Sequence, residues 1–257
     1  MKFLDRALFV CEAVVSPLAW GMFVVLTIFW TTLMMDVYII RRWVDPQLRW
    51  VHRLGCCWGY SLIAMVPGSL VQLFGRKSIP RDRPVIFMAN HQSYCDIPVL
   101  YHLWWQFKWM ADAPLFTIPF LGGGMRAAGY VPVKRGDPKA GLRSLEQAKE
   151  WLAKGISIFI FPEGTRSHTG GFGRFQTGGF RLAVTTGTPI VPVVLVGSRQ
   201  LLPRGGWIFR WWARLQIHVL PAVTPASSDA GQVRGLARQV RAQMARVYRQ
   251  HLKEARR

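Results

Sequence analysis

The chain has few acidic residues and lacks the short motifs of several common enzyme classes. Of its 257 residues, 13 are Asp or Glu and 33 are Lys or Arg, so the formal net charge is +20. It contains no G-x-S-x-G elbow, no Walker A loop and no H-E-x-x-H motif, which argues against the sites that these patterns build. The excess of positive charge favours a polyanionic partner: a nucleic acid, an anionic lipid or a phosphorylated substrate.

Metal-binding and disulfide patterns are also missing. The four cysteines have no C-x-x-C spacing, and two of them lie in apolar stretches, where a thiol usually serves as a small hydrophobic group. Apart from His91, which is considered below, the histidines show no ligand spacing. We therefore predict neither a metal site nor a disulfide framework.

Two long uncharged runs lie near the N-terminus. Residues 13–35 contain no charge over 23 residues, a length that can span a hydrocarbon core, and residues 54–75 form a second run that Gly and Pro interrupt. The Arg-rich segment between them is typical of a cytoplasmic loop. We expect residues 1–75 to form a membrane-anchoring helical hairpin, as two spans or as a half-buried pair. Two buried helices of a soluble protein are the alternative.

Beyond this hairpin, short apolar runs alternate with helical patterns. The runs show little alternation, as expected of strands buried on both faces; they are residues 85–89, 129–133, 156–161, 190–196 and 215–220. Helices are predicted over residues 97–105, 139–154 and 178–187. Residues 76–257 should therefore form an α/β domain with a mainly parallel sheet covered by helices.

The C-terminal stretch, residues 231–257, has apolar residues near helical spacing with Arg elsewhere. This pattern predicts a basic amphipathic helix. Such a helix either packs on the domain or lies on anionic lipid.

A histidine and a carboxylate follow the first of these strands. His91 and Asp96 are five positions apart across a turn, at the strand edge where ligands bind in open α/β sheets. A neutral imidazole can take a proton from an alcohol, and a carboxylate on its other nitrogen would orient it. We predict His91 as the base and Asp96 as its orienter; the alternatives are a turn histidine and a helix-capping Asp96.

Two further clusters follow later strands. In residues 161–167, F-P-E-G-T-R-S, the glycine permits close backbone approach and Arg166 can grip a phosphate with two donors. Residues 129–136 end with Lys134 and Arg135, which are also suited to a phosphate. The alternatives are a strand-to-loop turn and plain surface exposure.

Together these segments resemble the glycerolipid acyltransferase family. The resemblance rests on N-H-x4-D at residues 90–96, the F-P-E-G-T-R-S block, the Gly-to-Arg segment at residues 129–135 and V-P-V at residues 191–193, in the family's order. It implies a cytoplasm-facing domain, held on the inner membrane by an N-terminal hydrophobic segment. The implied reaction moves a fatty acyl group from acyl-CoA or acyl carrier protein to the sn-2 hydroxyl of 1-acylglycerol-3-phosphate, with no metal or redox cofactor.

The resemblance also implies roles for individual residues. His91 would deprotonate the acceptor hydroxyl with support from Asp96. The acceptor site would be formed by Glu163, Gly164, Thr165, Arg166 and Arg135, with the two arginines binding its phosphate.

Two departures from the family keep other functions open. Asp112 and Gln176 stand where relatives often have lysine, which leaves room for a lysophospholipid acceptor in place of lysophosphatidic acid. A rival of another class is a non-catalytic basic protein that binds anionic lipid or nucleic acid at a membrane surface. It leaves the His91 and Glu163 blocks unexplained, so we expect no nucleic-acid partner.

Overall fold

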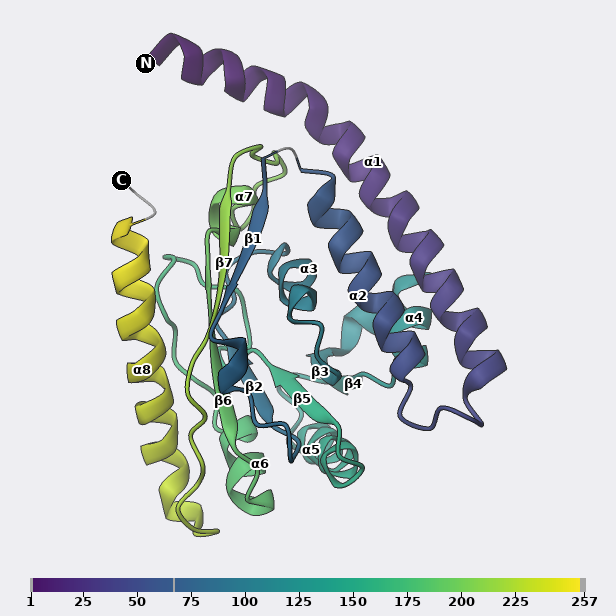
Figure 1. Cartoon of the computed structure of the whole chain (residues 1–257), viewed down its shortest axis with the longest axis vertical. Coiled ribbons are helices and arrows are strands. Elements are labelled where there is room, and N and C mark those ends of the chain that lie inside the picture. The colour runs from purple at the N-terminus through teal and green to yellow at the C-terminus, as the bar shows by residue number, and fades with distance from the viewer. Residues whose placement is uncertain (1, 67, 255–257) are drawn as a thin grey trace.

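The computed structural model describes residues 2–66 and 68–254, which form a seven-stranded sheet with helices on both faces (Figure 1). The helices are α1 (Lys2–Arg41), α2 (Arg49–Ala64), α3 (Asp96–Leu100), α4 (Leu121–Ala127), α5 (Pro138–Ala153), α6 (Gly178–Thr186), α7 (Ser198–Leu201) and α8 (Val233–Glu254). The strands are β1 (Leu70–Phe74), β2 (Ile86–Ala89), β3 (Phe107–Asp112), β4 (Val131–Val133), β5 (Ser157–Ile160), β6 (Ile190–Val196) and β7 (Arg214–Val219).

The sheet is mainly parallel, as predicted. Its order is β1-β7-β6-β2-β5-β3-β4, and the antiparallel step lies between β6 and β7. Strands β6, β2, β5, β3 and β4 run parallel to one another. Their carboxyl ends therefore meet at one edge, where the loops that follow them come together.

The five predicted strands are present, and two more were not foreseen. Strand β3 contains Lys108 within an aromatic segment, so its sequence does not read as an apolar run. Strand β1 lies inside residues 54–75, which we assigned to the anchoring hairpin. Helix α2 ends at Ala64, and β1 then pairs with β7 at the sheet edge. Gly68, just before β1, has a φ of 72°, a conformation that favours glycine.

Each face of the sheet has its own apolar core. Along β2, Phe87 belongs to the core that contains side chains of α1, α2 and α4, whereas Met88 belongs to the core that contains side chains of α5, α6 and α8. Both side chains are fully buried. Because successive strand side chains point to opposite faces, a short apolar strand such as β2 supplies both layers.

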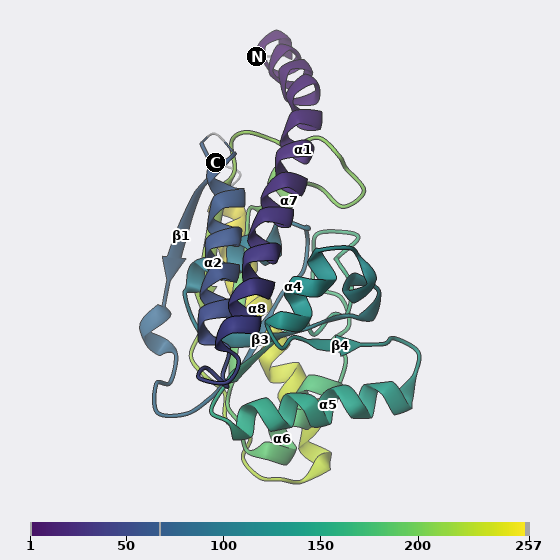
Figure 2. The ribbon, with the colours of Figure 1, turned by 90° about the vertical axis from the view of Figure 1, so that its right-hand side faces the viewer.

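Helix α1 lies along the domain for much of its length, beside α2 and α4 (Figures 1 and 2). Within the described residues, it is the one helix long and apolar enough to cross a membrane. Its outer face is exposed and apolar, with Val14 73% and Leu18 70% exposed. The inner face approaches α4 closely, since a Cβ on Gly124 would lie 2.7 Å from the Thr31 side chain.

An ion pair with a buried carboxylate holds the first half of α1. Glu12 accepts hydrogen bonds from the Arg210 guanidinium at 2.8 Å and from the Trp211 backbone N–H at 3.0 Å. Ser16, one turn later, accepts from the backbone N–H of Phe209 at 2.9 Å. Glu12 is 2% exposed, and a buried carboxylate requires partners of this kind. The loop before β7 therefore docks on α1.

Helix α8 packs on the domain, the first of the two predicted alternatives. Its apolar stripe is buried against α6 and β6; the stripe consists of Val233, Leu236, Val240, Met244 and Tyr248. Arginines such as Arg234 and Arg238 lie on its exposed side.

Candidate active site

His91 and Asp96 form a hydrogen-bonded pair at the carboxyl end of β2. The His91 Nδ1 lies 2.7 Å from the Asp96 Oδ2. His91 is the second residue after the strand, and Asp96 is the first residue of α3. The side chain of Asp96 is fully buried, whereas 17% of the His91 side chain remains exposed.

The surroundings of Asp96 hold its carboxylate in place. Its Oδ2 also accepts the backbone N–H groups of Gln92 at 2.5 Å and Ser93 at 2.9 Å. Three donors, counting the imidazole of His91, therefore converge on this one oxygen. A carboxylate can only accept a hydrogen bond, so the Nδ1 of His91 carries the proton and the Nε2 lone pair is available to a substrate.

An aromatic stack supports the imidazole from one side. The ring of His91 lies parallel to that of Phe161, with centroids 4.0 Å apart and an interplanar angle of 14°. Phe161 in turn stacks on Trp109, at 5.5 Å. The rotamer of His91 is therefore set by packing as well as by Asp96, which is the preorganisation that a general base needs.

Glu163, in the block at residues 161–167, accepts a hydrogen bond from the block at residues 90–96. Its Oε1 accepts the backbone N–H of His91 at 3.2 Å, and its Oε2 accepts that of Gly173 at 2.7 Å. The carbonyl of His91 accepts the N–H of Ser167 at 2.7 Å. Burial raises the pKa of Glu163, and the hydrogen bonds from Gly173 and His91 oppose that shift. Strands β2 and β5 are neighbours, which is why these loops meet.

Asn90, the residue before His91, serves the scaffold. Its side chain donates to the carbonyl of Leu195 at 3.0 Å and accepts the N–H of the same residue at 2.8 Å. The amide thus continues the pairing of β2 with β6 past the end of the strand. The buried Asn90 positions the turn that carries His91.

The rest of the 161–167 block forms a turn beside this cluster. Gly164 has a φ of 70°, which favours glycine, and Thr165 is exposed. The guanidinium of Arg166 lies 3.6 Å from the centroid of the Tyr94 ring, and its carbonyl accepts a hydrogen bond from Arg204. A guanidinium stacked on a ring in this way can still direct its N–H edge at a phosphate.

Arg135 lies farther along the same edge. It follows β4, three strands from β2 in the sheet order. Its guanidinium pairs with the carboxylate of Asp112, the last residue of β3, at 3.2 Å. Asp112 is one of the positions where the sequence departs from the family. In the structure its carboxylate contacts Arg135, which the sequence predicts to bind the phosphate. The pair is partly exposed. The negative charge of Asp112 offsets part of the positive charge with which Arg135 would attract a phosphate.

Several residues that hold the site were not predicted. Gln92 donates from its side chain to the carbonyl of Gly170 at 3.0 Å and to the hydroxyl of Tyr248 at 2.7 Å. Ser93 donates to the carbonyl of Leu202 at 2.7 Å. Gln92 and Ser93 lie within the N-H-x4-D block and could have been considered. Tyr248 lies 156 positions away, and nothing in the sequence connects it to the motif.

The arrangement places an imidazole that can act as a base beside a loop whose guanidinium can bind an anion. His91 presents Nε2 with Asp96 behind it, and Arg166 lies in the loop that follows β5, the neighbouring strand. A base so oriented can remove a proton from an alcohol as the alcohol attacks a carbonyl carbon. The site therefore suits acyl transfer to a hydroxyl.

Comparison with known proteins agrees with this chemistry. Residues 71–196 match the family model described as Acyltransferase. A 1-acyl-sn-glycerol-3-phosphate acyltransferase of Pseudomonas aeruginosa is 30% identical over 178 residues, which cover 69% of this chain and 68% of that protein. A chloroplastic relative of the same name from Arabidopsis thaliana is 37% identical over 63% of this chain and 45% of its own length. The chain spans about half the length of the plant and algal relatives.

A solved structure has the same fold. The crystal structure of the 1-acyl-sn-glycerophosphate acyltransferase PlsC from Thermotoga maritima superposes with a TM-score of 0.77. It is 25% identical, and the match covers 94% of this chain and 97% of that one. The likeness therefore extends beyond the α/β domain to most of the N-terminal helices.

Proposed function

The chain belongs to the acyltransferase family that includes the 1-acyl-sn-glycerol-3-phosphate acyltransferases, and we propose that it acylates the sn-2 hydroxyl of 1-acylglycerol-3-phosphate to form phosphatidic acid. The observation that carries the proposal is the 2.7 Å pair of His91 and Asp96. It stands beside the FPEGTRS turn at the carboxyl edge of a parallel sheet.

The proposed step is a direct transfer. The Nε2 of His91 takes the proton of the acceptor hydroxyl as its oxygen attacks the thioester carbonyl carbon. The tetrahedral intermediate collapses, the C–S bond breaks and the thiolate takes the proton from His91. Asp96 stabilises the imidazolium between these two events. The thioester is already activated, so the step requires neither a metal nor a redox cofactor. Acyl-CoA and acyl carrier protein both supply such a thioester.

A lysophospholipid acceptor is the second candidate. It is favoured by the ion pair between Arg135 and Asp112, because Asp112 offsets a charge that a phosphate monoester would use. An acceptor with a phosphodiester carries less negative charge and needs fewer cations.

For the cellular location, we propose the cytoplasmic face of the inner membrane. The exposed apolar side of α1 supports attachment to a bilayer. Helix α1 is also held along the domain through Glu12 and Ser16, which favours a helix that lies in the membrane surface over one that leaves the domain to cross it. The Arg-rich connection between α1 and α2 favours the cytoplasmic side.

The test is acyl transfer by the purified full chain. Wild type and His91→Ala are supplied with labelled acyl-CoA or acyl carrier protein thioester, and with lysophosphatidic acid or a lysophospholipid. We expect phosphatidic acid from the wild type and none from His91→Ala, with both proteins folded and bound to membranes. Activity retained by His91→Ala would contradict the catalytic role. Product with a lysophospholipid alone would favour the second candidate.

A further inference from the structure

Helix α8 lies outside the part of the chain that matches the family model, yet one side of it reaches the catalytic loops. The model covers residues 71–196, and α8 begins at Val233. The helix runs along the sheet (Figure 1) and packs against α6 and β6. Tyr248 and Arg241 are seven positions apart, or about two turns, so they lie on the same side of α8. Both side chains contact loops at the carboxyl edge of the sheet.

Tyr248 holds the side chain of Gln92, the residue after His91. The amide of Gln92 donates one hydrogen to the Tyr248 hydroxyl at 2.7 Å and the other to the carbonyl of Gly170 at 3.0 Å. Both Gln92 and Tyr248 are buried, so a lost partner is not readily replaced by water. The backbone N–H of Gln92 also donates to Asp96 at 2.5 Å. The hydroxyl of Tyr248 therefore fixes a residue that is itself bonded to the catalytic pair.

Arg241 holds the neighbouring loop, residues 168–177. Its guanidinium donates to the carbonyl of Phe172 at 3.0 Å and to that of Gly173 at 3.1 Å. The ring of Phe172 packs edge-on against that of Tyr248, with centroids 5.4 Å apart. The two contacts made by α8 thus belong to one connected group of side chains.

This loop depends on support from outside its own sequence. It contains Gly170, Gly171 and Gly173, and glycine loses more conformational freedom on folding than any other residue. The N–H of Gly173 is bonded to Glu163, and Glu163 also accepts the N–H of His91. The position of the glycine-rich loop is therefore linked to that of the catalytic turn.

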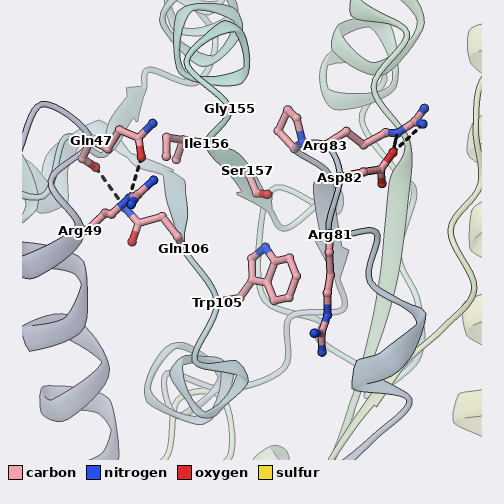
Figure 3. Close-up of a pocket in the computed structure, with 11 residues that line it drawn as sticks. Gln47, Arg49, Arg81, Asp82, Arg83, Trp105, Gln106, Gly155, Ile156 and Ser157 are labelled. Carbon is pink, nitrogen blue, oxygen red and sulfur yellow. Dashed lines mark hydrogen bonds and ion pairs between the residues drawn. The ribbon is translucent and has the colours of Figure 1, made fainter.

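The amino edge of the sheet is held differently. Two of the arginines that line the cavity there pair with near neighbours in the sequence (Figure 3): Arg83 donates to Asp82, and Arg49 donates to Gln47. At the carboxyl edge, the buried contact with α8 joins residues 156 positions apart. Such a contact forms only when α8 is packed on the sheet. The catalytic edge is therefore the end of the sheet that depends on this helix.

We propose that Tyr248 and Arg241 are positioning residues, through which α8 holds the catalytic turn in its reactive geometry. Tyr248 acts through Gln92, and Arg241 acts through the glycine-rich loop. Their role is to fix His91, because a misplacement of about 1 Å can cost roughly 100-fold in rate. The kinetic part of this inference rests on the proposed function, whereas the structural part can be measured without it.

The test uses Tyr248→Phe and Arg241→Ala in the full-length protein. Tyr248→Phe removes the hydroxyl and keeps the ring that packs on Phe172. Arg241→Lys is the conservative variant, since an ammonium group can still donate to a carbonyl. Arg238→Ala is the matched control, because Arg238 lies on the exposed side of the same helix, about one turn earlier.

The first measurement is backbone hydrogen exchange in detergent, read by mass spectrometry on peptides that cover residues 90–96. We expect Tyr248→Phe and Arg241→Ala to raise the exchange rate there about ten-fold, because a lost hydrogen bond changes a local opening equilibrium by this order. Arg238→Ala should exchange like the wild type, and Arg241→Lys should lie between the two. Wild-type exchange in both test variants would overturn the proposal.

The second measurement is steady-state kinetics, at a temperature below the melting of every variant. We expect the kcat of Tyr248→Phe to fall roughly ten-fold or more, with little change in KM for either substrate. In a Gln92→Ala background the same change should have no further effect, because the contact is already lost.

Two kinetic results would overturn the proposal: a wild-type kcat per folded molecule in Tyr248→Phe, which leaves the hydroxyl a purely structural role, or full additivity of the Tyr248 and Gln92 losses. An absence of transfer by the wild type would instead contradict the proposed function. Hydrogen exchange would then still decide whether α8 holds the turn.

Discussion

The carboxylate of Glu163 accepts the backbone N–H of His91 at 3.2 Å, across the boundary between β5 and β2. Its other oxygen accepts the backbone N–H of Gly173 at 2.7 Å. The sequence predicts Glu163 as part of the acceptor site. The contacts indicate a second role, in which Glu163 holds the catalytic turn against the FPEGTRS block. Its replacement should then affect catalysis through the position of His91.

The first prediction concerns Glu163→Gln. Glutamine can accept from only one of the two N–H groups, since its other terminal atom is itself a donor. We expect a loss of about 1–3 kcal/mol in stability and a lower kcat with little change in KM for the acceptor. Thermal melts and steady-state kinetics measure both. An unchanged kcat would contradict the positioning role.

The same variant has a predicted pH dependence. Burial raises the pKa of Glu163 above its usual value of 4.5, so the native state binds the proton more tightly than the unfolded state. The resulting stabilisation is fully present below pH 4.5 and is lost as the pH rises through the raised pKa. Wild type should therefore lose stability relative to Glu163→Gln as the pH rises through this window. Melts over a pH series, in one detergent, provide the comparison.

Asp96→Asn should separate orientation from proton transfer. The amide cannot stabilise the imidazolium and can hold His91 in the wrong tautomer, so we expect kcat to fall by roughly 10²–10⁴-fold. KM for both substrates should change little, because Asp96 is fully buried and contacts His91 and backbone groups. A fall of less than a few-fold would show that His91 does not depend on Asp96.

Asp112→Lys tests the choice of acceptor. The change removes the carboxylate that pairs with Arg135 and adds a cation at the end of β3. We expect KM for lysophosphatidic acid to fall several-fold relative to KM for a lysophospholipid, since one exposed ion pair contributes up to about 1 kcal/mol. Asp112→Asn is the control, which frees Arg135 without adding a charge. An unchanged ratio of the two KM values would show that Arg135 does not bind the acceptor.

Lys108 predicts a second pH effect. Burial lowers its pKa to about 7, and Asp45 opposes that shift. The side chain is fully buried and donates to the carbonyls of Gln47 and Ala128. The unfolded state therefore holds this proton more tightly, and stability should rise with pH from about 7 towards the usual value of 10.5. Lys108→Met should lack this rise, which melts in alkaline buffers would reveal.

Much of the fold could be predicted from the sequence, because buried parallel strands are short apolar runs bounded by turns. Residues 190–196 are such a run, and they form β6. Strand β3 was not predicted, because Lys108 interrupts its apolar sequence. Only tertiary contacts can make that position suitable, since the carbonyl groups of Gln47 and Ala128 and the ring of Trp151 satisfy the ammonium group.

The residues of the site were likewise predicted where they lie within one motif. His91 and Asp96 are separated by a single turn, so the sequence predicted the pair, with a turn histidine and a helix-capping Asp96 as alternatives, and the structure shows the hydrogen bond. Asp112 and Arg135 come from different strands, and their ion pair depends on β3 lying beside β4. The contact of Gln92 with Tyr248 depends on how α8 crosses the sheet.

By itself the sequence determined the parallel α/β domain, the apolar character of α1 and the pairing of His91 with Asp96, because these follow from local periodicity and spacing. Only the tertiary structure decided that residues 70–74 join the sheet, that Glu163 binds the His91 backbone and that Gln92 contacts Tyr248. Those features bring together segments far apart in the chain, whose proximity depends on strand order and helix packing and leaves no local pattern.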